Sequence, residues 1–326
     1  MYEAFFGLQQ RPFPSGPCTK FYFAARAIDD AFRALSRLVE RDEGIGLVVG
    51  GVGTGKTLVC HLLVEKFSDR FSAILLASGR LTSPKVVLQH ILFELKLPYR
   101  QMDEGELRLS LLDYLEQKRG NEKDLLLAID EAHSLPLRVL EELRLLSCLV
   151  RGGRSRVRLI FSGLPRFEER LAVPRLEALN QRIAVRCYLD NLSLQETVEY
   201  VAHQLSVAGT RADAIFSDDA LRAIHRYTDG IPRLVNQLCD HAMILACADG
   251  RRTVDAALLE EAWCDLQRLP LRKEPQNGNR ESQLSAVIEF GTLDDSWEEP
   301  IDSYRHRRRP WGRKFRSCYS GQLRTG

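Results

Sequence analysis

Residues 50–57 read Gly50-Gly51-Val52-Gly53-Thr54-Gly55-Lys56-Thr57. These positions fit G-x-x-x-x-G-K-[ST], the pattern of a phosphate-binding P-loop. The run at 44–49 before them is apolar, and the segment 58–67 after them has helical periodicity. A loop of this kind closes its backbone N–H groups around phosphates at the positive end of a helix dipole. We therefore predict a buried strand, a nucleotide-binding loop made of all these residues, and a helix.

Two side chains of this loop have separate predicted roles. Lys56 is placed to reach the β- and γ-phosphates of a nucleotide, and the Thr57 hydroxyl is placed to bind Mg²⁺. The alternative is a glycine-rich turn with a chance lysine, and the flanking strand and helix patterns argue against it. ATP and Mg²⁺ are therefore the predicted cofactors.

Length and composition describe an ordinary globular protein with room for two domains. Of the 326 residues, 44% are hydrophobic and 28% are charged, with a net charge of +2. The N-terminus has no basic region, and no run approaches the roughly 18 apolar residues of a membrane span. The eight cysteines form no C-x-x-C pair, which favours reduced thiols over disulfides or zinc. We expect a cytoplasmic protein.

Short apolar runs alternate with helical patterns around the P-loop. Strands are predicted at 45–50, 72–77, 125–129, 157–162 and 183–188. Helices are predicted at 28–39, 55–67, 83–95, 104–117 and 137–149, with short helical pieces over 166–180. This alternation predicts an α/β fold with a five-stranded parallel sheet, built from right-handed βαβ units and covered on both faces.

The regions on either side of this pattern differ from it. Residues 1–27 are rich in aromatic residues and proline, and we expect an ordered arm that packs on the following domain beside the nucleotide's base. A disordered tail is the alternative for this arm. Beyond strand 183–188 only helices follow, at 193–207, 217–227, 232–248 and 254–266. The predicted domains are the arm at 1–27, the ATPase core at 28–190 and a small all-α lid at 191–269.

Segregated charge marks the last segment, residues 270–326. Residues 274–302 hold eight acids against one arginine, and residues 305–326 hold eight Lys/Arg and no acid. Low hydrophobicity and separated charge predict a disordered acidic-then-basic tail. Aromatic residues among its arginines favour contact with nucleic acid or with an anionic membrane surface. A merely solvated tail is the alternative.

The second candidate motif is Asp130-Glu131-Ala132-His133, at the end of an apolar strand. At the C-terminal end of its strand, beside the P-loop in the sheet, Asp130 can hold the Mg²⁺ water shell and Glu131 can polarise the water that attacks the γ-phosphate. Acidic residues also occur by chance at helix N-termini, which is the alternative. His133 is expected to be part of the turn. The four letters spell a helicase signature, but one core with a small lid does not make a two-core helicase.

Taken together, these motifs resemble an AAA+ ATPase. More specifically, the chain resembles the ATPase module of the general secretion pathway protein A (ExeA-like) family and its relatives in exopolysaccharide and exosortase loci. The resemblance covers about residues 1–267 and combines the P-loop and residues 130–133 with further segments, of which the N-terminal aromatic signature together with Gly-Ile-Pro-Arg at 230–233 is far more specific than the P-loop. These segments are 1–2, 5–8, 12–13, 163–165, 169–171, 180–183 and 230–236. The resemblance implies ATP hydrolysis and a homo-oligomer with nucleotide at its subunit interfaces.

Two arginines acquire roles only through this resemblance. Arg182, just before strand 183–188, matches the position of an arginine finger that acts on the neighbouring subunit. Arg233 in the lid matches the sensor 2 arginine, which contacts the γ-phosphate across the domain cleft. The alternative for both is an ordinary solvated arginine.

At one position the sequence departs from the family pattern. The family usually has Gly-Gln-Pro after the fourth strand, at the sensor 1 position, whereas this chain has Gly163-Leu164-Pro165. A leucine side chain cannot orient a water molecule. Either Ser162 substitutes for it or the sensing step is weakened, which puts the hydrolysis rate in doubt more than ATP binding.

Two functions fit the sequence. The first is an ATPase that drives assembly or remodelling of a protein complex, in secretion or in exopolysaccharide or envelope biogenesis, with an unidentified protein client. The alternative is an ATP-dependent DNA-associated switch that resembles transposition-regulator ATPases. The Phe-Phe-Gly-Leu signature favours the first function, and the basic tail favours the second. Secretion-type members continue through a membrane helix into a peptidoglycan-binding domain, so a direct envelope-remodelling role does not carry over to the tail seen here.

Overall fold

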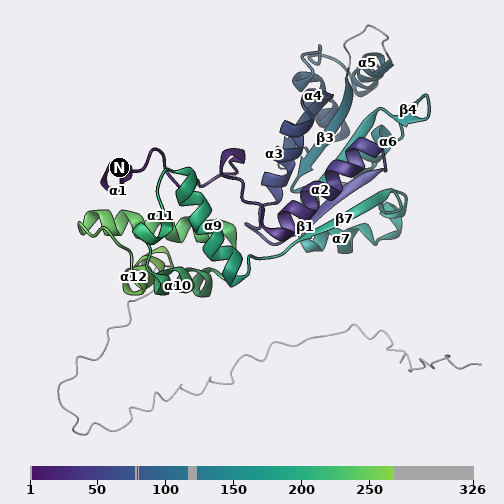
Figure 1. Cartoon of the computed structure of the whole chain (residues 1–326). Coiled ribbons are helices and arrows are strands. Elements are labelled where there is room, and N and C mark those ends of the chain that lie inside the picture. The colour runs from purple at the N-terminus through teal and green to yellow at the C-terminus, as the bar shows by residue number, and fades with distance from the viewer. Residues whose placement is uncertain (1, 78, 80, 117–122, 268–326) are drawn as a thin grey trace, which may run out of the picture. The chain divides into compact units, whose positions relative to one another are not determined.

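A parallel sheet places the P-loop at the carboxyl end of its central strands (Figure 1). The computed structural model describes residues 2–77, 79, 81–116 and 123–267. The sheet has five strands in the order β2-β3-β6-β1-β7. Their bounds are β1 Ile45–Gly50, β2 Phe71–Ala77, β3 Asp124–Asp130, β6 Val157–Gly163 and β7 Ile183–Leu189. All the predicted strands are therefore confirmed.

The order of the strands is not predicted from the sequence. In the structure β6 lies between β1 and β3, and Asp130 at the end of β3 still lies beside the P-loop, because the Thr57 hydroxyl donates to it. Leu159 of β6 is in register with Ile45 of β1 on one side and with Leu127 of β3 on the other. An apolar run shows that a strand is buried but carries no information about its neighbour in the sheet.

Helices cover both faces of the sheet. One face is covered by α2 (Arg26–Arg41) and α3 (Lys56–Phe67). The other face is covered by α4 (Pro84–Glu94), α5 (Glu104–Glu116), α6 (Leu137–Ser147) and α7 (Pro165–Leu171). Successive side chains of a strand point to opposite faces. Accordingly, Leu47 of β1 packs on the side of α4, α5, α6 and α7, and Val48 packs on the side of α2 and α3.

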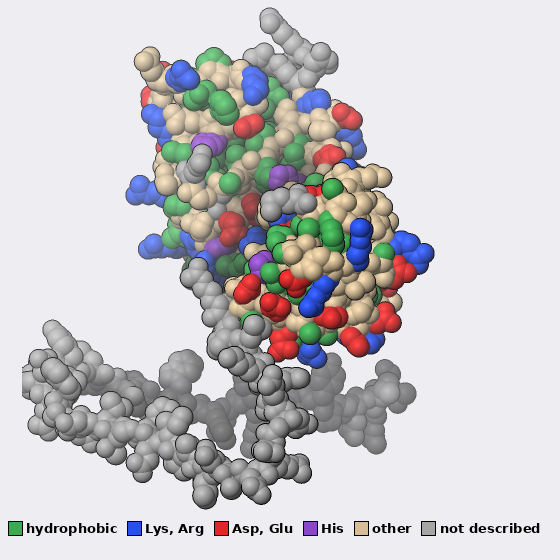
Figure 2. Space-filling view, turned by 90° about the vertical axis from the view of Figure 1, so that its left-hand side faces the viewer, with side chains coloured by type: hydrophobic (Ala, Val, Ile, Leu, Met, Phe, Trp, Pro, Cys, Tyr) green, Lys and Arg blue, Asp and Glu red, His purple; other side chains and the backbone are tan. Residues whose placement is uncertain are grey.

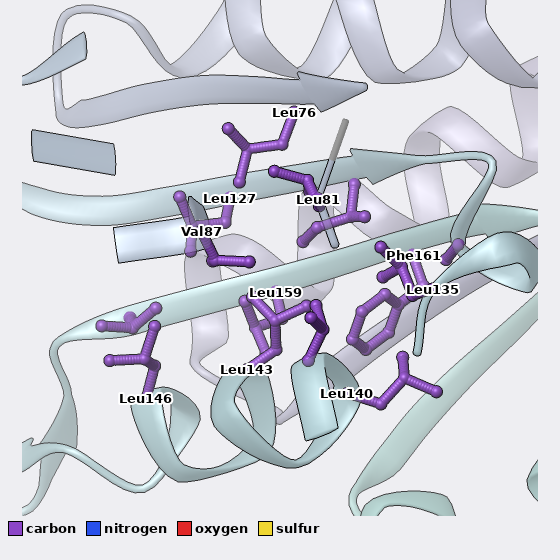
Figure 3. Close-up of a cluster of buried hydrophobic side chains, with 14 of the residues drawn as sticks. Leu76, Leu81, Val87, Leu127, Leu135, Leu140, Leu143, Leu146, Leu159 and Phe161 are labelled. Carbon is purple, nitrogen blue, oxygen red and sulfur yellow. The ribbon is translucent and has the colours of Figure 1, made fainter. Parts of the chain in front are cut away.

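Figure 3 shows how the face beneath α6 is filled. Leucine side chains of α6 point toward side chains of β3 and β6. Leu140, Leu143, Leu127, Leu159 and Phe161 are all fully buried. Full burial of such a side chain stabilises the fold by about 1.5–3 kcal/mol, so this layer holds the strands that carry the site in a fixed relation.

Helix starts agree with their sequence signals. The Ser83 hydroxyl accepts the N–H of Val86 at 3.4 Å, at the start of α4. Ser193 and Glu196 form the predicted capping box at the start of α9 (Leu194–Val207). The short hairpin of β4 (Val150–Arg151) and β5 (Arg154–Ser155) is not anticipated in the sequence, because its strands have only two residues each.

A second apolar core joins the helices that follow the sheet. It contains α9, α10 (Asp218–Thr228), α11 (Pro232–Ala248) and α12 (Ala256–Gln267). The helical region is thus confirmed, while the domain boundaries at 27/28, 190/191 and 269/270 remain predictions. The remaining short pieces are α1 (Glu3–Phe6), η1 (Thr19–Phe21), η3 (Ala132–Ser134), η4 (Pro174–Leu176), α8 (Glu177–Asn180) and η5 (Ala212–Ala214).

The N-terminal arm packs mainly on the helical region. Tyr2, Leu8 and Phe13 are buried in the same core as α9 to α12, whereas Tyr22 packs beside α2. The prediction that the arm packs on the domain that follows it is therefore only partly right. The aromatic density of the arm indicates that it is buried but not which surface covers it.

Three further predictions concern the chain as a whole. Within the described residues, no helix combines the length and apolarity needed to cross a membrane. Cysteines in this part of the chain are free thiols, and Cys60, Cys187 and Cys239 are buried. The predicted disordered tail lies outside the described residues.

Candidate functional site

The loop between β1 and α3 leaves little room for side chains at Gly50, Gly53 and Gly55. Gly53 and Gly55 have φ of 84° and 101°, values that favour glycine. A Cβ at Gly50 would lie 2.6 Å from the Thr54 hydroxyl oxygen and 2.9 Å from the Leu189 carbonyl oxygen. The backbone itself therefore lines the loop, which is the property that phosphate binding by main-chain N–H groups requires.

Lys56 folds back over this loop. Its side chain is buried, and its Nζ donates to the carbonyl oxygens of Gly50 at 3.1 Å and Gly51 at 2.6 Å. Burial lowers the pKa of Lys56, while the carboxylates of Glu131 and Asp130 act in the opposite direction. A buried ammonium whose hydrogen bonds go to neutral carbonyls is poorly compensated. The negative charge of a phosphate would compensate it, so this residue fits the predicted nucleotide.

Three oxygen-bearing side chains converge beside the lysine from three different elements. The Thr57 hydroxyl of α3 donates to Asp130 Oδ2 of β3 at 2.7 Å. The Ser162 hydroxyl of β6 donates to the other carboxylate oxygen of Asp130. Hard oxygen ligands suit Mg²⁺, which usually keeps several waters and binds substrate phosphates. The hydroxyl and carboxylate oxygens of this cluster fit such an ion. Within the described residues no group of three or more His, Cys, Asp or Glu side chains could hold a metal ion.

Glu131 lies at the end of β3 with its side chain about half exposed. Its backbone has φ of 55°, a left-handed conformation that is uncommon outside glycine. This conformation ends the strand and brings the carboxylate to the wall of a cavity that Lys56 also lines. Its Oε2 lies 3.5 Å from Nε2 of His133, whose own side chain is 6% exposed.

The cavity is about 400 Å³ and extends from the P-loop to the arm and the helical region. This volume lies in the range of small-molecule sites. Its walls come from the core (Lys56, Glu131), the arm (Phe13, Phe23) and the helical region (Gln204, Arg233). The phosphate-binding loop and the aromatic arm thus face one space, as expected if the arm lies beside a nucleotide's base.

Arg233 is brought to this cavity by the start of α11. Its N–H donates to the carbonyl oxygen of Gly53 at 3.3 Å. A Cβ at Gly53 would lie only 2.9 Å from Cβ of Arg233. Gly230 is required just before this helix, because a Cβ there would lie 1.9 Å from the Leu192 carbonyl oxygen. The structure therefore joins Arg233 to the P-loop, and its contact with a γ-phosphate stays a prediction.

Arg182 is not brought to the P-loop of its own chain. It is exposed at the amino end of β7, and its carbonyl oxygen accepts the N–H of Ile45 at 3.0 Å. The P-loop follows Gly50, at the opposite end of β1. Five strand steps of about 3.3 Å separate these two ends by roughly 16 Å. Arg182 could therefore serve a nucleotide site only in another copy of the chain.

One buried network beside the cavity is missed by the sequence interpretation. Asp240 of α11 accepts hydrogen bonds from the Tyr2 hydroxyl at 2.5 Å and from Arg11 Nε at 2.7 Å. Arg11 and Asp240 both line the cavity. The aromatic arm was the signal that pointed to this region. No local pattern connects partners 229 residues apart.

Comparison with known proteins shows what this chain is similar to. The AAA_22 family, described as an AAA domain, matches residues 39–171. General secretion pathway protein A of Aeromonas hydrophila is 34% identical over 255 residues, which make up 78% of this chain and 46% of that protein. The chain thus spans less than half the length of this relative.

Solved structures share the fold at low sequence identity. Cdc6p from Pyrobaculum aerophilum has a TM-score of 0.61 at 17% identity, over 75% of this chain and 69% of that one. The ORC2 protein of Aeropyrum pernix has a TM-score of 0.59 at 16% identity, over 78% and 72% of the two chains. The RuvB Holliday junction branch migration motor of Thermotoga maritima has a TM-score of 0.52 at 17% identity, over 79% and 73%.

Proposed function

Because the chain carries an AAA+ module of the general secretion pathway protein A (ExeA-like) type, we propose that it binds ATP with Mg²⁺ and hydrolyses the ATP to drive assembly or remodelling of a protein complex. The observation that carries this proposal is the convergence of the P-loop, the Thr57–Asp130–Ser162 cluster and Glu131 at one cavity.

In the proposed reaction each residue has one task. Lys56 and the backbone of residues 50–57 hold the phosphates, and Thr57 and Asp130 hold Mg²⁺. When bound, the ion neutralises charge that develops on the β- and γ-phosphates. Glu131 orients the attacking water and accepts its proton, and Arg233 reports the state of the γ-phosphate to the helical region.

The Glu131 carboxylate suits this task because it is placed at the cavity wall yet stays accessible. Its side chain is 49% exposed, so water reaches it. Phosphoryl transfer needs mainly positioning and electrostatic stabilisation, so few residues suffice. Ser162 supports the site from β6 by orienting Asp130 through its hydroxyl.

The first experiment measures nucleotide affinity by fluorescence titration. Lys56→Ala should abolish ATP binding, because the charge that faces the phosphates is lost. Lys66→Ala is the matched control, since Lys66 lies at the other end of the same helix, where its Nζ contacts Glu40 and the rings of Phe32 and Phe67. Equal affinity in wild type and Lys56→Ala would reject the site.

The second experiment separates binding from hydrolysis. Glu131→Gln should keep ATP bound while turnover falls by about 10²- to 10⁴-fold, because the amide cannot accept a proton from water. An unchanged turnover number would mean that the water is positioned by another group.

We further propose a homo-oligomer in which Arg182 acts as the arginine finger of the neighbouring subunit. This follows from its place, roughly 16 Å along the sheet from its own P-loop. The protein client is the part of the proposal that rests on the relative alone. To identify the client, the Glu131→Gln variant, which should remain ATP-bound, would be purified from the native cell together with the proteins bound to it.

The alternative function, an ATP-dependent DNA-associated switch, rests on the basic segment 305–326, outside the described residues. The face shown in Figure 2 has acidic and basic side chains interspersed and no surface of one sign. Such a face offers little general attraction for a phosphate backbone. ATPase activity measured with and without duplex DNA, on the whole chain and on residues 1–269, distinguishes the two functions. Stimulation that requires the tail would favour the DNA switch.

A further inference from the structure

The ring of His133 is buried between two loops at the carboxyl end of the sheet. It belongs to η3, directly after Glu131, and its side chain is 6% exposed. On one side, Nδ1 accepts the N–H of Leu164 in the loop between β6 and α7 at 3.4 Å. On the other side, Nε2 lies 3.5 Å from Glu131 Oε2. The ring therefore joins two parts of the site that no sequence motif connects.

These contacts determine which ring nitrogen carries the proton. A backbone N–H can only donate, so Nδ1 must be the unprotonated acceptor. A neutral imidazole then has its proton on Nε2, the atom that faces the Glu131 carboxylate. Burial lowers the pKa of His133, which favours the neutral ring. The ring thus presents its N–H toward the Glu131 carboxylate, with Nε2 and Oε2 3.5 Å apart.

The backbone of His133 is also held from the β6–α7 side. Arg170 of α7 donates to the carbonyl oxygen of His133 at 2.9 Å. The chain passes so close here that a Cβ at Gly163 would lie 3.5 Å from the His133 nitrogen and 3.3 Å from Phe167. These contacts link the backbone of His133 to this loop, and the Leu164 N–H links the ring to it.

We infer that His133 is a positioning residue, which holds the Glu131 carboxylate through Nε2–H and ties it to the Leu164 N–H through Nδ1. This inference rests on the proposed role of Glu131 in hydrolysis. The inference also gives Leu164 a role that does not depend on its side chain. The backbone N–H of Leu164 connects the end of β6 to His133, and the ring of His133 connects it to Glu131. This connection needs no water-orienting side chain at position 164.

Three substitutions distinguish the contribution of Nδ1 from that of Nε2. His133→Gln can place an amide N–H near the position of Nε2 and keep the contact with Glu131. His133→Asn can place an acceptor near Nδ1 and keep only the hydrogen bond from Leu164. His133→Phe keeps an aromatic ring in this place but removes both interactions.

We expect kcat for ATP hydrolysis to fall about tenfold or more in His133→Phe and His133→Asn, because displacement of a catalytic group by about 1 Å is costly. ATP affinity and thermal unfolding should stay close to wild type, and His133→Gln should keep most of kcat. In a Glu131→Gln background the His133 substitutions should cause no further loss. Wild-type kcat in both His133→Phe and His133→Asn would overturn the inference, as would equal additional losses in the Glu131→Gln background.

A second measurement does not depend on hydrolysis. In protein labelled with ¹⁵N-histidine, the His133 ring signals should show a protonated Nε2 and a bare Nδ1, and Glu131→Ala should shift the Nε2 signal. His133→Phe identifies the signals among the seven histidines. A proton on Nδ1 at neutral pH would overturn the inference even if the enzyme is active. Conversely, an inactive wild type, or a fully active Glu131→Gln variant, would contradict the proposed function and leave the ring geometry supported by the spectrum.

Discussion

The carboxylate of Asp240 should hold the N-terminal arm on the helical region, and its replacement should release the arm. Asp240 is 8% exposed, and it accepts hydrogen bonds from Tyr2 and from two nitrogens of Arg11. Burial and the neighbouring carboxylate raise the pKa of Tyr2, so this hydroxyl stays a donor at neutral pH. Asp240→Asn keeps the side-chain volume, removes the charge, and turns one acceptor into a donor that faces the guanidinium.

The size of the effect follows from the exposure of the partners. Loss of one partner from a fully buried ion pair costs about 3–5 kcal/mol. The Arg11 side chain is 52% exposed, so solvent screens much of its charge. We therefore expect about 2 kcal/mol, which at about 1.4 kcal/mol per tenfold is roughly a 30-fold change in the opening equilibrium of the arm.

Hydrogen exchange at Gln9 measures this opening directly. Its N–H donates to the carbonyl oxygen of Ala208 at 2.9 Å, so it exchanges when the arm leaves the helical region. Asp240→Asn should accelerate exchange there about 30-fold, the factor derived above. Asp213→Asn is the matched control, because Asp213 pairs with Arg211 on the surface of the same region with side chains 63% and 84% exposed. Equal exchange rates in the two variants would refute the reasoning.

Three other predictions concern the nucleotide site. Ser162→Ala should raise the Mg²⁺ concentration that gives half-maximal ATPase activity about tenfold, because a hydrogen bond to a charged group contributes about 1.5–3 kcal/mol. An unchanged Mg²⁺ titration would mean that the Ser162–Asp130 hydrogen bond does not contribute to metal binding. Gly53→Ala should weaken ATP binding and destabilise the fold by about 1–2 kcal/mol, because a Cβ there would meet Arg233. Gly79→Ala is the control, because a Cβ there has no atom within 4 Å. In the same nucleotide titration and thermal melt, the control should change neither the affinity nor the stability. A mixture of inactive Arg182→Ala and inactive Lys56→Ala proteins should regain ATPase activity, because a finger is worth about 10³- to 10⁵-fold in rate; a mixture that stays inactive while wild-type specific activity rises with concentration would contradict the role of Arg182.

Local patterns were sufficient to predict the sheet and the helices, because each element is encoded by its own periodicity. The strand ending at Asp130 and the helix start at Ser193 needed only a few adjacent residues. The position of β6 between β1 and β3 is a long-range choice, and nothing in the three apolar runs distinguishes it from the alternative order. The short hairpin at Val150–Arg151 was missed because a strand of two residues is too short to show any periodicity in the sequence.

The site shows the same division between local and long-range information. The P-loop and Asp130-Glu131 are contiguous motifs, and the structure brings them together through the Thr57–Asp130 hydrogen bond. The role of His133 could not be read from the sequence, because its partner at 164 contributes a backbone N–H that any non-proline residue has. The same holds for the Asp240 network, whose members come from opposite ends of the described chain.

The contact of the arm with α11 also has a consequence for synthesis. Tyr2 and Asp240 are 238 residues apart, so the ribosome makes the arm long before its binding surface. At about 5–20 residues per second, roughly 12–48 s pass before Asp240 has been added. Tyr2, Leu8 and Phe13 spend this time without the helices that bury them, whereas the sheet already has all its strands once Leu189 has emerged. This part of the arm therefore cannot dock until the helical region has been synthesised.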